Sequence, residues 1–119
     1  MRKIFFVLLM ALSYSSWAEW TLIHTDEKAS NYIDLDSIHT VKNLKRVWFL
    51  SNKIKTPTST TSLVEFDCEE RRTRTIAFNY HSAPNGLGEK KFTEIIPEWG
   101  FIQPRTITET ILKQVCKKS

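Results

Sequence analysis

The sequence contains few of the residues on which common enzyme motifs depend. It has three glycines, and it contains neither a glycine-rich phosphate loop nor a GxSxG turn for a nucleophilic serine. Its histidines, His24, His39 and His81, lie in separate segments without a metal-binding spacing. Asp34 and Asp36 resemble a carboxylate pair, but aspartates at this spacing are better explained as turn residues. We therefore expect no enzymatic activity, no metal site and no cofactor.

Long apolar runs are absent beyond the N-terminus. Two basic residues precede nine apolar residues (4–12), and residues 16–18 (SWA) have the small-x-small pattern of a signal peptidase site. We expect residues 1–18 to be a cleaved signal peptide, which leaves residues 19–119 as a single domain of 101 residues (119 minus 18). A membrane span needs about 20 apolar residues, so we expect no transmembrane segment.

The expected mature chain also lacks a strong charge and a lipid-anchor cysteine. Removal of Arg2 and Lys3 leaves 15 basic side chains (17 minus 2) against 13 acidic ones. A net charge of +2 is too weak to indicate nucleic-acid binding, which uses a concentrated basic face. No cysteine ends the signal segment, so a lipid anchor there is not expected. These features predict an exported protein that is periplasmic or released, with the cell surface as the alternative.

The two cysteines, Cys68 and Cys116, predict one disulfide. Exported proteins fold in an oxidising compartment, and a small core benefits from a covalent link. A metal site would need more ligands than these two. A catalytic thiol would need a nearby base, which the sequence does not show.

A C-terminal helix is predicted to carry the second cysteine. Thr106 and Glu109 have the spacing of a capping box at a helix N-terminus. The apolar residues that follow share one helical face: Ile107, Ile111, Leu112, Val115 and Cys116. A helix of this length is marginal in isolation, so we expect it to pack on a sheet.

The stretch LVEFDCEERRTR predicts a charged hairpin whose turn is Glu69-Glu70. This register places opposite charges across from each other and sets Cys68 opposite Arg71. The two charged pairs are Asp67 with Arg72 and Glu65 with Arg74. Alternation along the first strand puts Val64, Phe66 and Cys68 on the face that should meet the helix. A salt-bridged hairpin explains the charges better than a binding patch does, although Glu-Glu is a poor tight-turn pair.

Further strands are expected on either side of this hairpin. Their predicted ranges are Trp20–His24, Ser30–Ile33, Arg46–Ser51 and Lys90–Ile95, with a strong turn at SAPNGLG. The sequence therefore predicts an α+β fold, in which an antiparallel sheet of about six strands is joined by a disulfide to one C-terminal helix.

One helix covers one face of such a sheet, which raises the question of what covers the other. Simple alternation places Ile76, Phe78 and Tyr80 on the face opposite the cysteine. Either loops cover this second face, or it binds a ligand or a second copy of the chain. The candidate partner face comprises Trp48, Leu50, Arg72, Arg74, Phe78 and Tyr80.

With these elements in place, the chain resembles the surface-adhesin protein E family of Gram-negative bacteria. The resemblance rests on ordered blocks: WTLI, YIDLDSI, RVWFL, SLVEFDCEERRTR and PEWGFIQPRTITETILKQVC. It implies a six-stranded antiparallel sheet with a disulfide-linked C-terminal helix. It also implies architectural roles for Trp20, Asp34, Ser37, Ile38, Trp48, Cys68, Arg72 and Cys116.

By this resemblance the chain is a binding module of the cell envelope whose partner is a protein, such as host extracellular-matrix protein, and which can form a homodimer. No motif identifies ligand-binding residues. Two alternatives stay open: an envelope or stress-related protein with an internal partner, and a periplasmic enzyme or small-ligand-binding protein that uses the second sheet face.

Overall fold

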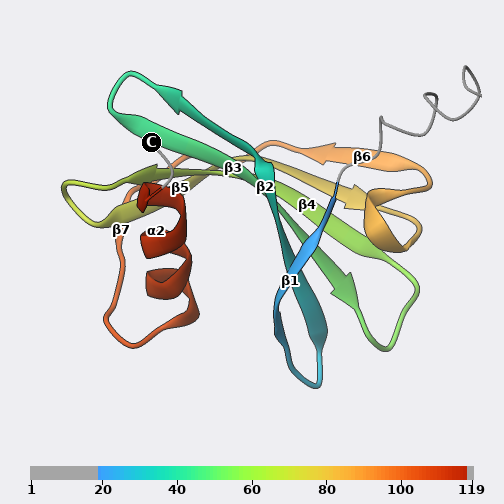
Figure 1. Ribbon diagram of the computed structural model, residues 1–119. Helices are drawn as coiled ribbons and strands as arrows, with labels where there is room; N and C mark the ends of the chain where they lie inside the picture. Colours follow the sequence, from blue (N-terminus) through green and yellow to red (C-terminus); the bar gives the residue numbers. More distant parts are fainter. Residues whose placement is uncertain (1–18, 118–119) are drawn as a thin grey trace, which may run out of the picture.

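The computed structural model of the protein describes residues 19–117, so the predicted signal peptide lies outside the described residues. One antiparallel sheet contains six strands in sequence order, and a seventh short strand also pairs with β5 (Figure 1). The strands are β1 (Thr21–Thr25), β2 (Ala29–Val41), β3 (Leu44–Lys53), β4 (Ser59–Asp67), β5 (Arg72–His81), β6 (Lys90–Thr93) and β7 (Gly100–Phe101). With the C-terminal helix α2 (Ile107–Lys117), they confirm the predicted fold class.

Strand β2 is much longer than the predicted Ser30–Ile33. The residues expected to end it instead form an irregularity within it, where the register with β3 shifts after Asp34. The Ser37 hydroxyl donates to the carbonyl of Asp34 (2.7 Å) and accepts from the backbone N–H of Trp48 (3.0 Å). Because these side-chain bonds replace ladder bonds, the strand continues through residues that are typical of a turn.

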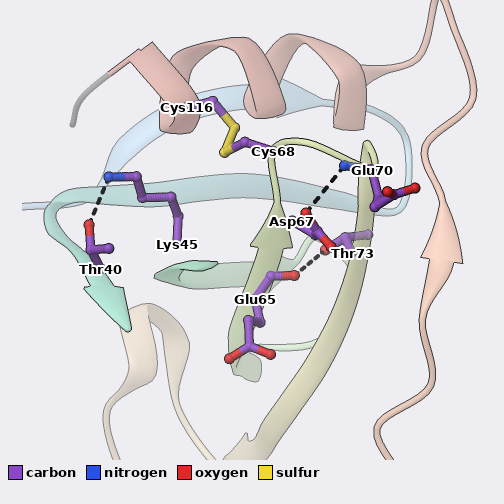
Figure 2. Close-up of a disulfide and its surroundings, with 8 residues drawn as sticks. All are labelled: Thr40, Lys45, Glu65, Asp67, Cys68, Glu70, Thr73 and Cys116. Atoms are coloured by element: carbon purple, nitrogen blue, oxygen red, sulfur yellow. Dashed lines mark hydrogen bonds between the residues drawn. A yellow bond between two sulfur atoms is a disulfide. The ribbon is translucent and has the colours of Figure 1, made fainter. Parts of the chain in front are cut away.

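The core lies between the sheet and α2. Ile33, Val47 and Phe66 project from the sheet, and three helix residues pack against them: Ile111, Leu112 and Val115. Cys116 of the helix is bonded to Cys68, directly after β4, and Figure 2 shows this link between helix and sheet. The predicted disulfide and the predicted packing of Val64 and Phe66 toward the helix are both confirmed. We call this side of the sheet the helix face.

The predicted cap is present at the start of α2. The backbone N–H of Glu109 donates to Thr106 Oγ1 (3.2 Å), and Glu109 Oε1 accepts from the backbone N–H of Arg105 (3.2 Å). The other carboxylate oxygen, Oε2, accepts from Arg71 at 2.8 Å. Glu109 therefore ties the helix N-terminus to the turn between β4 and β5.

The charged hairpin has the predicted pairs, although its turn differs. Asp67 lies opposite Arg72 and Glu65 opposite Arg74, as expected. The connection spans residues 68–71, and Cys68 does not pair with Arg71 in the ladder. Arg71 adopts a positive φ of 54° and belongs to the turn, whereas the predicted two-residue turn placed it in the following strand. The wider turn leaves Cys68 facing the helix.

A bulge in β5 makes the predicted placement of Phe78 and Tyr80 wrong. Leu63 pairs with Ala77 and Val64 with Thr75, so Ile76 is an extra residue in β5. An extra residue reverses the alternation of every side chain that follows it. Phe78 and Tyr80 therefore lie on the helix face, the same side as the disulfide.

The opposite side of the sheet, the helix-free face, carries Arg46, Trp48, Leu50, Glu65, Arg72 and Arg74. The chain itself covers both ends of this face. At one end the 3-10 turn η2 (Pro84–Gly86) lies over Leu50, which is 1% exposed. At the other end the Trp99 ring stacks against Arg72 and Arg74. The structure thus supports loops as the partial cover of the second face.

Candidate binding face

A shared carboxylate organises the centre of the helix-free face. Glu65 Oε2 lies 2.8 Å from Arg46 Nε, and Glu65 Oε1 lies 2.6 Å from Arg74 Nη2. Figure 2 shows the Glu65 carboxylate pointing away from the helix. Its side chain is completely buried, whereas both guanidinium groups are partly exposed. Arg46, Glu65 and Arg74 thus form a rigid bridge across β3, β4 and β5.

The charge state of Glu65 follows from its environment. Burial by itself raises the pKa of its carboxyl group. Hydrogen bonds and favourable charges from Arg46 and Arg74 outweigh burial and hold this pKa below its ordinary value. Glu65 is therefore ionised at neutral pH.

Trp99 extends this array along β5. The guanidinium carbons of Arg72 and Arg74 lie 4.5 and 4.4 Å from the centre of the Trp99 ring, within the range of a cation–π contact. Arg72 Nε also donates to Asp67 Oδ2 at 3.0 Å. Burial raises the pKa of Asp67, but the Glu70 N–H and Arg72 outweigh it and lower that pKa. Each arginine is therefore fixed by both a carboxylate and the tryptophan.

We call Arg46, Glu65, Asp67, Arg72, Arg74 and Trp99 the arginine–tryptophan array. It contains three guanidinium groups and two carboxylates, so it carries one excess positive charge. The arginine side chains are held in place yet remain partly exposed. An arrangement of this kind offers planar donors to an acidic group without a large loss of side-chain entropy.

The structure divides the six residues predicted for the partner face. Trp48, Arg72 and Arg74 lie together on the helix-free face. Leu50 shares that face but is buried beneath η2, so it is not accessible to a partner. Phe78 and Tyr80 lie on the helix face and do not belong to the group.

Sequence reasoning did not assign Arg46, Glu65 or Trp99 to this face. The alternation of RVWFL places Arg46 on the same face as Trp48, and the predicted hairpin register pairs Glu65 with Arg74. Both residues could therefore have been assigned to this face from the sequence. The position of Trp99 had no such signal, because it depends on how residues 94–99 return to the sheet.

A second polar cluster on the same face is buried beneath the β5–β6 connection. Thr61 Oγ1 lies 2.8 Å from His81 Nε2 and also accepts from Asn79 Nδ2 at 3.3 Å. His81 is 7% exposed, and its Nδ1 atom is buried without a hydrogen-bond partner. Burial, with a smaller effect from the positive charge of Lys90, lowers the pKa of His81.

Neither a metal cluster nor a membrane helix is found in the part of the chain that the structure describes. Among residues 19–117, no group of three or more His, Cys, Asp or Glu side chains is placed to hold a metal ion. No helix in the same range has the length and apolar character needed to traverse a bilayer.

Comparison with solved structures gives the same fold. A structure of Haemophilus influenzae protein E superposes with a TM-score of 0.68 at 13% identity, covering 87% of each chain. A second crystal form gives 0.67 at 13% identity, covering 87% of this chain and 91% of the other. Protein E from non-typeable Haemophilus influenzae gives 0.63 at 11% identity, covering 83% of this chain and 76% of the other.

Comparison of sequences identifies the family. No curated protein matches the chain. The family model for surface-adhesin protein E, in contrast, matches residues 20–117, which is nearly the whole described domain. The chain therefore belongs to the surface-adhesin protein E family.

Proposed function

We propose that the chain is an exported, non-catalytic adhesion module that binds a protein partner through its helix-free face. Membership of the adhesin family supports the general role. The partner surface consists of Trp48, Arg72 and Arg74 from the sequence prediction, together with Arg46 and Trp99 of the arginine–tryptophan array.

The observation that carries this proposal is the stacking of Trp99 against two arginines on a partly exposed sheet face. Tryptophan and arginine are enriched among the residues that dominate protein–protein binding energy. Here they are already ordered in the free protein, so binding does not have to immobilise them. The excess positive charge of the array favours a partner segment that contains Asp or Glu.

The proposed form in the cell is residues 19–119 as a single domain, after removal of residues 1–18. We place the mature protein in the periplasm or outside the cell, and its partner is then an envelope protein or, for displayed or released protein, host extracellular matrix.

A binding assay tests this function. Purified residues 19–119 are passed over immobilised host extracellular-matrix proteins and, separately, over solubilised outer-membrane proteins. An unrelated protein of similar net charge serves as the control. Saturable binding that weakens as salt is added supports the proposal. Binding no greater than that of the control protein on both panels would contradict it.

Self-association is the second candidate, and an exposed apolar edge favours it. Phe92, Ile96 and Phe101, from β6, β7 and the segment between them, are 63%, 84% and 77% exposed. Apolar side chains at a sheet edge are a common basis for pairing between copies. Light scattering at increasing protein concentration tests this, with Phe92→Asp as the variant expected to remain monomeric. A wild-type chain that stays monomeric contradicts self-association.

A further inference from the structure

The two halves of α2 pack against the sheet to different extents. In the second half, Leu112 and Val115 are completely or almost completely buried, and Cys116 is bonded to Cys68. In the first turn, Ile107 is 43% exposed. The helix is thus held tightly at its C-terminal end and covers the sheet less completely at its N-terminal end.

Two hollows flank the first half of the helix. One, of about 300 Å³, lies between α2 and the helix face of β1 to β5. The other, of about 220 Å³, lies between α2 and strands β1 and β2. Both are lined by Ile23, Ile107 and Ile111, so they adjoin each other around these three side chains. We call the two adjoining hollows together the helix cavity.

The lining of the helix cavity is mainly apolar, and it is free of carboxylate, ammonium and guanidinium groups; its one ionisable side chain is the imidazole of His24. In the larger hollow the apolar residues are Ile23, Phe49, Val64, Phe66, Ile107 and Ile111. Neither hollow is lined by a lysine, arginine, aspartate or glutamate. An ionised group of a ligand would lose hydration here, which is costly. The His24 imidazole offers little compensation, because Asp26 already lies 3.7 Å from its Nε2 atom.

Polar side chains at the same cavity have spare hydrogen-bonding capacity. Asn31, Thr75 and Thr108 line the larger hollow. Hydrogen bonds from their side chains to other groups are not found within residues 19–117. A mainly apolar pocket with a few available polar groups is the usual composition of a small-molecule site.

We propose that the helix cavity binds an uncharged amphiphile, a molecule with a linear alkyl chain and a neutral hydrogen-bonding head. The apolar side chains of the lining accommodate the alkyl chain. Because the two hollows meet around Ile107 and Ile111, a flexible linear molecule can extend from one into the other. Asn31, Thr75 and Thr108 supply donors and acceptors to the head group. This site does not depend on the proposed adhesion function, because it lies on the opposite side of the sheet from the arginine–tryptophan array.

Displacement of a fluorescent probe tests the proposal. N-phenyl-1-naphthylamine, which is neutral and apolar, is titrated into residues 19–119 with the disulfide intact, and 1-dodecanol and dodecanoate are then used as competitors at pH 8. We expect saturable binding of one probe per chain and displacement by dodecanol at a concentration at least tenfold lower than dodecanoate requires. Equal displacement by both would overturn the assignment of an uncharged ligand, and failure of dodecanol to displace the probe would overturn the amphiphile site.

Cavity-filling variants locate the binding. Thr75→Phe fills the cavity from the sheet and Thr108→Phe fills it from the helix, so one remains informative if the other does not fold. Each is expected to weaken probe binding at least tenfold. Thr60→Phe is the matched control, since Thr60 lies on the helix face but does not line either hollow. Equal weakening by all three substitutions, or by none, would contradict the site.

Discussion

Glu65 lies directly opposite Arg74 across β4 and β5, and the Arg74 guanidinium comes within 2.6 Å of Glu65 Oε1. The same carboxylate accepts from Arg46 on the other neighbouring strand. One completely buried acid thus links three strands of the helix-free face and orders the arginines that we assign to partner binding.

Replacement of Glu65 by Gln should destabilise the fold strongly. The variant removes the negative charge and leaves Arg46 and Arg74 close together without it. We expect a loss of about 3 kcal/mol in the free energy of unfolding, at the lower end for a broken buried ion pair because both arginines are partly exposed. Urea denaturation measures the loss. Glu69→Gln, in the exposed turn of the same hairpin, should change stability little, and an equally small change for Glu65→Gln would contradict the role of this carboxylate.

Removal of the disulfide should lower the free energy of unfolding by a large fraction of its total, without abolishing folding. Cys68 and Cys116 are 48 residues apart, and loop closure over that length restricts the unfolded chain by about 4 kcal/mol. The double variant Cys68→Ala/Cys116→Ala should therefore unfold at a much lower urea concentration than the oxidised wild type. Reduced wild-type protein provides the comparison, since it lacks the bond but keeps both side chains. A midpoint unchanged by reduction would contradict a stabilising link.

Stability should depend on pH through His81. Its pKa is lowered by burial, so the unfolded chain binds a proton more readily than the folded chain does. The contribution of neutral His81 to stability is therefore fully present above the ordinary histidine pKa of 6.5, and it decreases as the pH falls below that pKa. Thermal unfolding between pH 8 and 5 measures the effect. His81→Gln should flatten this part of the profile, and a profile that is the same in both proteins would show that His81 is not its cause.

The carboxylates act in a lower pH range. Glu65 and Asp67 have lowered pKa values, so their contribution is present above their ordinary values of 4.5 and 3.8 and is lost as the pH falls below these values. A second decrease in stability below about pH 4.5 is therefore expected. Glu65→Gln should reduce this second decrease without altering the one assigned to His81.

Loss of the helix cap should lower the free energy of unfolding by less than loss of the Glu65 carboxylate or of the disulfide. Thr106 accepts the backbone N–H of Glu109 at the start of α2, and replacing such a cap by alanine typically costs about 1 kcal/mol. Thr106→Ala should lower the free energy of unfolding by this amount in the oxidised protein. Thr110→Ala, at an exposed position in the same helix, is the control and should produce no loss. Equal effects of the two substitutions would argue against a specific cap.

The features that could be predicted from the sequence depend on short spacings. The pair Glu65 and Arg74 follows from the hairpin register, and the cap follows from the separation of Thr106 and Glu109. The disulfide follows from two cysteines in a chain whose N-terminal sequence predicts export. In each case the deciding contact lies between neighbouring elements or between the only residues of their kind.

The features that were missed depend on irregular backbone or distant contacts. The bulge at Ile76 carries no glycine or proline signal, yet it moves Phe78 and Tyr80 to the other face. Burial of Leu50 depends on the fold of the β5–β6 connection over the sheet. The contact of Trp99 with Arg72 likewise depends on the return of a later segment, which spacing along the sequence does not determine.

The most direct test of partner binding compares aromatic truncations on the two faces of the sheet. Biolayer interferometry measures the affinity of wild type, Trp99→Ala and Tyr80→Ala for the matrix or outer-membrane protein that binds wild type, with circular dichroism confirming that each variant is folded. Tyr80 is an exposed aromatic residue on the helix face. Our account predicts at least a tenfold loss of affinity for Trp99→Ala and little change for Tyr80→Ala. Unchanged binding by Trp99→Ala, with a loss in Tyr80→Ala, would place the partner on the helix face and contradict the account.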